Sequence, residues 1–376
     1  MKITRIETIE CPEYGSIIWI RIHTDEGFIG LGETYSLTEP VKTLIERVFG
    51  PAYLLGKDPL QIEALWRGMF DRCNHAGWSG AEMRAMSAID LALWDILGQK
   101  AGLPIYQLLG GACRDRIRIY NTSGPYKSFD FMKNADEYAQ YLLETGIDAM
   151  KIWPFDGFAR ESGGQYLSLA QLEKALEPVR KVRKAVGNAM DLAIECHGHW
   201  NLNCAVRIAH ALEEYEVMWL EDMIKPDNLD AYEQLSKATR LPLIVSERLL
   251  TRYQFLPVMQ RGIARIINPD VEWCGGISEG KKIATMAETY QLPVAFHNYG
   301  GPLLNFASAH VAASTPNMMM LETGLNLLEI WQNAVITNPV VVKDGHMALP
   351  EGPGMGTALR EDFLERDDVT IGTVGA

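Results

Sequence analysis

Three glutamates occupy matching positions along the chain. Glu195, Glu221 and Glu247 each end or directly follow a short apolar run, and the two intervals between them are equal. Carboxylates held close together repel one another and raise their own pKa values, and a hard divalent cation removes that repulsion. All-oxygen ligation suits Mg²⁺, whereas a single glutamate would more often pair with a neighbouring lysine or arginine. Three glutamates in phase therefore predict a magnesium site.

A second group of residues could hold an anion and move protons beside that ion. Asp270 and His297 each follow an apolar run, and a carboxylate beside a histidine fixes the imidazole tautomer and raises its basicity. His297 is therefore a candidate general base. Lys151 and Trp153 alternate along one run and share a face, so Lys151 could bind an anionic substrate or pair with a glutamate. Glu322 could hydrogen-bond to a substrate oxygen or form a salt bridge at the rim.

The elements that must position these residues are eight short apolar runs, most of them followed by a helical pattern. Repeated strand–helix units of this kind predict an α/β fold with a closed parallel barrel, in which the site lies at the C-terminal ends of the strands. An open doubly wound sheet is less favoured, because the G-x-G at Gly30 and Gly32 lies in a hairpin and not at a strand–helix turn. The runs are Ile117–Tyr120, Ala149–Ile152, Leu192–Glu195, Met218–Glu221, Leu243–Ser246, Arg265–Asn268, Val294–Phe296 and Met319–Glu322.

The segments on either side of the barrel have different patterns. Residues 1–115 combine β-rich runs around a turn at Asp25–Gly27 with helical spacing further on, which predicts an α+β unit. We expect the barrel over residues 116–345. The turn-rich residues 346–376 are expected to fold back onto another part of the molecule.

Composition excludes several classes of protein. The 376 residues are 47% hydrophobic and 22% charged, with a net charge of −13, which is typical of a soluble globular chain and disfavours nucleic acid as a partner. The six cysteines are scattered without a CxxC pair, which fits a reducing cytoplasm. We find neither a secretory signal nor an apolar stretch of about 18 residues, so we expect no membrane association.

Four longer motifs, together with the acids at the strand ends, resemble signatures of the enolase superfamily, in its mandelate racemase-like subgroup. The motifs are TDEGFIGLGE, AIDLALWDILGQKAGLPIYQLLGG, PDVEWCGGISEGKKIA and DGHMALPEGPGMG. The resemblance covers nearly the whole chain. It implies a modified TIM barrel, (β/α)7β, under an α+β N-terminal capping domain that the C-terminal tail completes. It also implies a homo-oligomer, either a dimer or an octamer.

The same resemblance implies roles for the site residues. Glu195, Glu221 and Glu247 would bind Mg²⁺, which stabilises an enediolate, and His297 with Asp270 would remove a proton α to a carboxylate. In this reading, Glu322 would hydrogen-bond to the carboxylate of the substrate and Lys151 would help to stabilise the enediolate.

Two departures from the family pattern favour dehydration. Many members end the second strand in Lys-x-Lys, but Trp153 replaces the second lysine here and cannot accept a proton, which disfavours two-base racemisation. The third strand ends Glu195-Cys196-His197, which is similar to the Asp-x-His of sugar-acid dehydratases such as galactonate dehydratase. His197 would then protonate the departing hydroxyl group, with His199 as the competing candidate.

We therefore expect a magnesium-dependent lyase that dehydrates an aldonate or aldarate to a 2-keto-3-deoxy acid. A racemase or epimerase of a hydroxy acid is the alternative among enzymes, and a non-catalytic binding protein on the same fold is the alternative outside them. Specificity would come from cap loops at Glu10–Gly15 and Asn74–Gly80. The candidate substrate-binding residues are Trp153, Tyr14, Trp78, His199 and Asn298.

Overall fold

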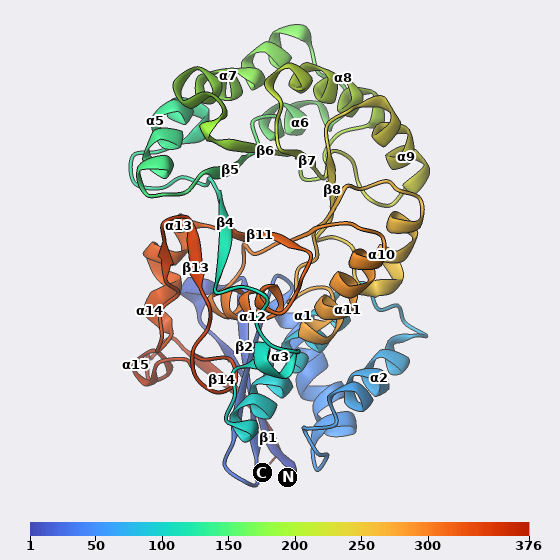
Figure 1. The fold of residues 1–376 in the computed structure, drawn as a ribbon. Coiled ribbons are helices and arrows are strands. Elements are labelled where there is room, and N and C mark those ends of the chain that lie inside the picture. The colour runs from blue at the N-terminus through green and yellow to red at the C-terminus, as the bar shows by residue number, and fades with distance from the viewer. Residues whose placement is uncertain (376) are drawn as a thin grey trace.

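A closed parallel barrel forms the larger unit of the computed structural model, which describes residues 1–375 (Figure 1). Its strands pair in chain order, and the last pairs with the first to close the ring, so the predicted barrel is confirmed. The strands are β4 (Arg116–Thr122), β5 (Ala149–Ile152), β6 (Asp191–Glu195), β7 (Trp219–Glu221), β8 (Leu243–Val245), β9 (Ile266–Ile267), β10 (Val294–Phe296) and β11 (Met318–Thr323).

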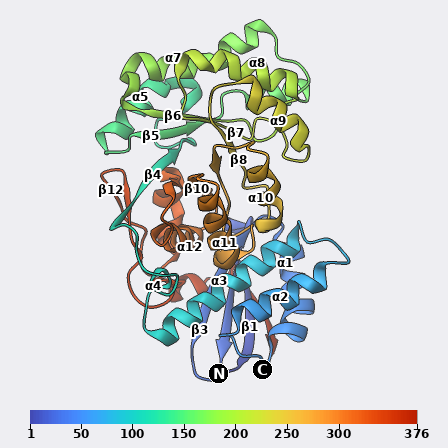
Figure 2. The same ribbon diagram turned by 45° about the vertical axis from the view of Figure 1, so that its right-hand side comes forward.

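Helices cover the outside of the barrel (Figures 1 and 2), and buried side chains fill its inside. Large Trp219 and Tyr120 pack in one interior layer with the small Ala149 and Ala193, as a tapering barrel requires. The outer helices are α5 (Phe131–Glu144), α6 (Asp156–Ser162), α7 (Leu169–Val186), α8 (Leu202–Leu212), α9 (Leu229–Ala238), α10 (Thr251–Gln260), α11 (Gly276–Thr289) and α12 (Pro302–Ala313). Short helical turns α13 (Leu325–Leu327), η5 (Leu328–Gln332) and α14 (Asn333–Val335) follow β11.

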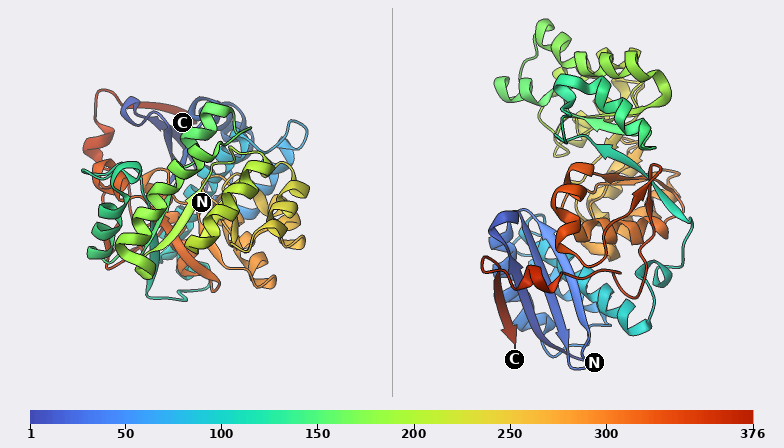
Figure 3. Two further views of the ribbon diagram at one scale, coloured as in Figure 1. Left: turned by 90° about the horizontal axis from the view of Figure 1, so that it is seen from above. Right: turned by 90° about the vertical axis from the view of Figure 1, so that its left-hand side faces the viewer.

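An antiparallel sheet with helices against it forms the cap. Its strand order is β14-β1-β2-β3, so the C-terminal segment pairs with β1, as the right-hand view of Figure 3 shows. The strands are β1 (Ile3–Glu10), β2 (Ile17–Thr24), β3 (Ile29–Tyr35) and β14 (Thr370–Gly375). The helices are α1 (Thr38–Leu44), η2 (Ile45–Leu54), α2 (Ile62–Cys73), α3 (Ala81–Ala101) and α4 (Ile105–Leu108).

Gly30 and Gly32 have a packing role in the cap. A Cβ atom at Gly30 would lie 2.1 Å from the carbonyl oxygen of Ala92, and one at Gly32 would lie 2.0 Å from that of Ala88. These two glycines therefore let α3 approach β3 closely, which explains a G-x-G that no phosphate-binding turn accompanies.

The tail connects both units before it joins the cap sheet. Strand β13 (His346–Ala348) pairs with β4 and with β12 (Val342–Lys343), and α15 (Glu361–Leu364) precedes β14. Asp95 of α3 accepts hydrogen bonds from the backbone N–H groups of Leu31 and Met355, each at 2.8 Å. One buried carboxylate thus fastens β3 and the tail to the same helix. Within residues 1–375, no helix combines the length and the apolar character that crossing a membrane requires.

His310 of α12 makes a second attachment of the tail, and we expect it to make stability depend on pH. Its ring accepts from the N–H of Tyr106 and donates to the carbonyl of Met355, and burial lowers its pKa to about 4. The unfolded chain takes up this proton near the ordinary value of 6.5, so the stabilisation is present above pH 6.5 and is lost as the pH falls toward 4. The loss amounts to about 2 kcal/mol by pH 5.

Urea unfolding of the wild type and of His310→Asn at pH 7 and pH 5 checks this effect. The variant lacks the two ring hydrogen bonds and starts less stable, but it should lose less stability between the two pH values than the wild type. Equal losses in the two proteins would show that His310 does not carry the effect.

Candidate active site

The ammonium group of Lys151 lies at the centre of a buried acidic cluster at the C-terminal ends of the strands. Its Nζ is 2.7 Å from Oε1 of Glu221, 2.9 Å from Oε1 of Glu322 and 3.6 Å from Oε2 of Glu195. Strands β5, β6, β7 and β11 bring these residues together, and Glu195 and Glu221 stand in register across β6 and β7. Lys151 therefore pairs with the glutamates, which is one of the two roles expected of it.

The three predicted metal ligands are held differently. Glu195 accepts from the backbone N–H groups that follow it, and Glu221 accepts from Trp219 and Asn268, each at 3.0 Å. Burial and the neighbouring charge of Glu195 raise the pKa of Glu221 despite Lys151. Glu247 lies two residues beyond the end of β8, and its buried Oε2 has no hydrogen-bond partner in the described part of the chain.

His297 and Asp270 form the expected dyad. Nδ1 of His297 lies 2.7 Å from Oδ2 of Asp270, and Oδ1 of Asp270 accepts from the backbone N–H of Glu272 at 2.7 Å. Burial acts to lower the pKa of His297, but the charges of Glu322 and Asp270 outweigh it and raise that pKa to about 10. Because Nδ1 is engaged with Asp270, Nε2 is the nitrogen left for a substrate proton.

Tyr35 of the cap also reaches this dyad, and nothing in the sequence pattern indicated it. Its hydroxyl donates to Oδ2 of Asp270 at 3.0 Å and lies 3.4 Å from Nδ1 of His297. Its ring packs on Trp273 with centroids 4.5 Å apart, and the guanidinium of Arg84 lies 3.8 Å from the Trp273 centroid. The cap thus contributes directly to the position of the candidate base.

Glu322 joins the lysine cluster to the dyad. It accepts from the hydroxyl of Thr122 and from the backbone N–H of Asn298 at 3.0 Å, and it lies 3.8 Å from Nε2 of His297. Burial opposes its ionisation, but Lys151 and His297 overcome that effect and lower the pKa of Glu322 to about 2. The side-chain amide of Asn298 donates to the Glu322 carbonyl, so this residue also serves to hold Glu322 in place.

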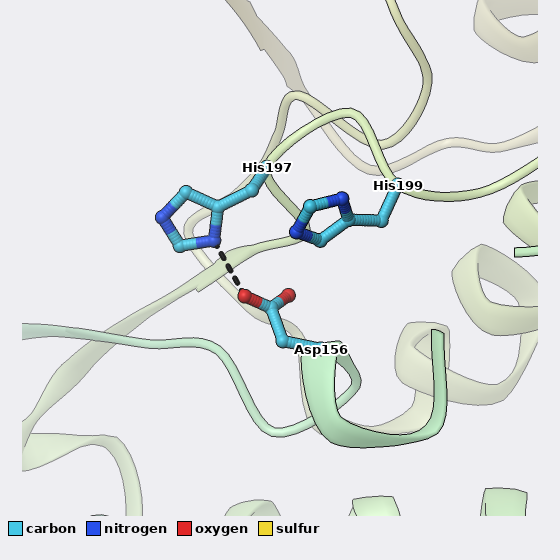
Figure 4. A group of neighbouring side chains, drawn as sticks. All are labelled: Asp156, His197 and His199. Atoms are coloured by element: carbon cyan, nitrogen blue, oxygen red, sulfur yellow. Dashed lines mark hydrogen bonds and ion pairs between the residues drawn. The ribbon is translucent and has the colours of Figure 1, made fainter. Parts of the chain in front are cut away.

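His197 forms a second aspartate–histidine pair, which sequence reasoning only half identified. Its Nδ1 lies 2.7 Å from Oδ2 of Asp156, the first residue of α6, and His199 approaches the same carboxylate (Figure 4). The ring of Trp153 stands nearly perpendicular to that of His197, with centroids 6.0 Å apart. Asp156 lies four residues after the end of β5, and nothing in the sequence indicated that it would face His197.

The predicted substrate-binding residues of the cap lie in two places. Tyr14 stacks on Trp331 with centroids 4.5 Å apart, and Trp78 packs against Phe70 in the cap core. The neighbouring Ser79 bonds to Gln254 at the start of α10. A cavity of about 710 Å³ opens between this cap loop and the barrel, and its lining includes Ser79, His197, Lys225, Arg248 and Tyr253.

Comparison with known proteins agrees with this architecture. Residues 133–363 match the enolase C-terminal domain-like family, and residues 8–110 match the N-terminal domain of the mandelate racemase and muconate lactonizing enzyme family. D-xylonate dehydratase of Haloferax volcanii is 33% identical over 370 residues, which cover 97% of this chain and 88% of that protein. D-gluconate dehydratase of Thermoproteus tenax is 31% identical over 353 residues, which cover 93% of this chain and 69% of that protein.

A solved structure extends the comparison to three dimensions. An enolase of the mandelate racemase subgroup from Agrobacterium tumefaciens superposes with a TM-score of 0.93 at 42% sequence identity. The match covers 100% of this chain and 99% of the other. The chain therefore belongs to the enolase superfamily, in its mandelate racemase subgroup.

Proposed function

We propose that the protein is a magnesium-dependent sugar-acid dehydratase, which converts an aldonate or aldarate to a 2-keto-3-deoxy acid. The observation that carries the proposal is the pair of aspartate–histidine dyads at the C-terminal ends of the strands: Asp270–His297 next to β10 and Asp156–His197 next to β6. Elimination of water needs a base for the α-proton and an acid for the β-hydroxyl, and each dyad can serve one of these roles. The dehydratase names of the relatives support the same reaction.

The donor chemistry of the three predicted metal ligands suits a magnesium ion. Glu195, Glu221 and Glu247 offer carboxylates only, and within the described residues Oε2 of buried Glu247 has no hydrogen-bond partner. Asp222 follows Glu221 and has one buried oxygen that no described residue bonds, and burial together with the charge of Glu247 raises the pKa of Asp222. A bound Mg²⁺ would supply positive charge to the substrate carboxylate and would lower the pKa of His297 toward the neutral form that a base needs.

The residues of the chain then divide the proton transfers between them. Nε2 of His297 takes the α-proton, and the C–H electron pair moves into the enediolate while Lys151 stabilises its negative charge. Nε2 of His197 gives its proton to the 3-hydroxyl as the C–O bond breaks, so one water leaves. The enol that remains tautomerises to the 2-keto acid. Trp153 stands beside His197 and has no basic nitrogen, so it cannot act as a second base.

The role of Glu322 in this scheme depends on whether its carboxyl group is protonated. It pairs with Lys151 and accepts from Thr122, which favours the ionised carboxylate, and that form has no proton to donate to a substrate carboxylate. We infer that it holds Lys151 and His297 in position. Donation to a substrate would require Glu322 to take up a proton when the substrate draws Lys151 away.

A screen of aldonic and aldaric acids with Mg²⁺ tests the function. Formation of a 2-keto acid whose mass is one water below that of the substrate, and its loss after chelation of the metal, is the expected result. An unchanged mass with altered stereochemistry would indicate an epimerase or racemase instead. The dehydratase proposal would be wrong if the protein bound sugar acids without converting them, or if it neither bound nor converted them.

Replacement of Tyr35 should change the pH dependence of that activity. In Tyr35→Phe, Asp270 loses one donor, so its charge acts more strongly on His297 and raises the pKa of the base. We expect kcat/KM at pH 7 to fall about tenfold, which corresponds to one hydrogen bond of roughly 1.4 kcal/mol.

The acid limb of the pH profile of kcat/KM should move to higher pH in Tyr35→Phe. The exposed Tyr166 offers a matched control, since Tyr166→Phe should leave the profile unchanged. A Tyr35→Phe profile that falls in height without moving along the pH axis would show that the hydroxyl acts on packing alone.

A further inference from the structure

A second group of potential metal ligands lies beside the glutamates and has different chemistry. One ligand atom from each of Asp156, His197 and His199 lies within 4.8 Å of the other two. Figure 4 shows the three side chains converging from the start of α6 and from the loop after β6. We propose that they form a binding site for a late first-row divalent ion such as Zn²⁺, separate from the proposed Mg²⁺ site.

The carboxylate of Asp156 supplies the independent observation that points to a ligand. Asp156 is 3% exposed, and its buried Oδ1 has no hydrogen-bond partner among residues 1–375, whereas Oδ2 contacts His197. An unpaired buried carboxylate oxygen is costly. In Figure 4 the free oxygen lies on the side of Asp156 that faces His199. An ion bound between Asp156 and His199 would give this oxygen its missing partner.

The donor atoms select the type of ion. Two imidazoles and one carboxylate suit Zn²⁺ and its neighbours, whereas the three glutamates offer the oxygen set that Mg²⁺ prefers. The backbone is left-handed at His197 and at Gly198, with φ of 49° and 66°. This turn places the rings of His197 and His199 with centroids 6.0 Å apart, close enough to share an ion after a small contraction.

The site is open to ions from solution. His199 is exposed, and it lines a cavity of about 460 Å³ together with Arg160, Gln165 and Lys225. The cavity gives a hydrated ion a path to His199, which lies next to the carboxylate of Asp156. An entry path and an incomplete set of buried partners are both features of a functional metal site.

Occupancy of this site would inhibit dehydration, a consequence that rests on the proposed function. Nδ1 of His197 would bind the ion and release its contact with Asp156, which orients the ring as the acid. The Asp270–His297 dyad lies on another part of the barrel mouth and would stay intact. Zinc should therefore suppress loss of the 3-hydroxyl while exchange of the α-proton with solvent continues.

Metal binding can be measured without any substrate. The protein is freed of transition metals and kept in excess Mg²⁺. Zn²⁺ is then titrated in competition with a chromophoric chelator, and Co²⁺ is titrated separately and followed by visible absorption. We expect one ion per chain and the intense absorption of a four- or five-coordinate site with nitrogen ligands. His199→Asn and Asp156→Asn should each weaken zinc binding at least about 10- to 100-fold. The exposed His210, bonded to the carbonyl of Ala238, provides the matched control, and His210→Asn should bind zinc as the wild type does.

Wild-type zinc affinity in His199→Asn would overturn the site. Loss of zinc binding in Glu247→Gln would then place the ion at the glutamates instead. Thermal unfolding of the metal-free variants checks that they fold. If Asp156→Asn does not fold, His199→Asn decides the question, because His199 lies on an exposed loop. Inhibition is read as the ratio of rates with and without zinc in each protein. If no sugar acid is turned over, the proposed function fails while the binding result still stands.

Discussion

His297→Asn should lose both dehydration and exchange of the α-proton with solvent deuterium. Nε2 of His297 is the atom that takes up the proton, because Nδ1 is engaged with Asp270. Asparagine has a similar size but no basic nitrogen. Loss of a positioned general base costs roughly 10²- to 10⁴-fold in rate. Proton exchange followed by NMR in deuterium oxide, and keto-acid formation followed in parallel, measure the two steps on the same samples.

Two further variants show whether the loss in His297→Asn is due to the missing base. Asp270→Asn keeps the imidazole but no longer holds its tautomer, so both rates should fall in parallel. The distant, exposed His210→Asn should leave both rates unchanged. Exchange at the wild-type rate in His297→Asn would place the base elsewhere, and Lys151 would then be the first residue to examine.

His197→Asn should separate the two steps that His297→Asn loses together. The Asp270–His297 dyad stays intact, so the α-proton should exchange with solvent at a rate near that of the wild type. The 3-hydroxyl must then leave without a proton from Nε2, and keto-acid formation should fall roughly 10²- to 10⁴-fold. NMR exchange and the keto-acid assay report the two outcomes independently.

The neighbouring histidine provides the comparison for this experiment. If His199 were the acid, His199→Asn would show the split between exchange and dehydration and His197→Asn would dehydrate normally. The contact between His197 and Asp156 favours His197, because the carboxylate fixes Nδ1 and leaves Nε2 to face the substrate. Normal dehydration by His197→Asn would remove it from the mechanism.

The barrel could be predicted from sequence because its signal is local and repeated. The runs Ala149–Ile152 and Val294–Phe296 coincide with β5 and β10, and buried parallel strands leave such short apolar runs between helical patterns. The predicted runs Met218–Glu221 and Arg265–Asn268 are longer than β7 and β9 by one residue at the start of β7 and at each end of β9. Pairing depends on the neighbouring strand, which a single run does not reveal.

The contacts of the site could be predicted only where residues end successive strands. Lys151, Glu195 and Glu221 lie at or next to the ends of the successive strands β5, β6 and β7, and the structure brings them together. Tyr35 and Asp156 do not, because one comes from a cap strand far away in sequence and the other from a helix after an irregular turn. The position of Tyr35 results from how the cap packs on the barrel, and that of Asp156 from how the loop after β5 folds. The spacing of residues along the sequence predicts neither.

The pairing of β14 with β1 has a consequence for the order in which the chain acquires its structure. Glu10 stands opposite Thr370, so the whole barrel lies between the two partners in sequence. During synthesis on a ribosome, β1 must wait at the edge of an incomplete sheet until every barrel strand has been made. An exposed edge strand invites pairing with other chains, so the nascent cap is the part of this protein that most needs protection from aggregation.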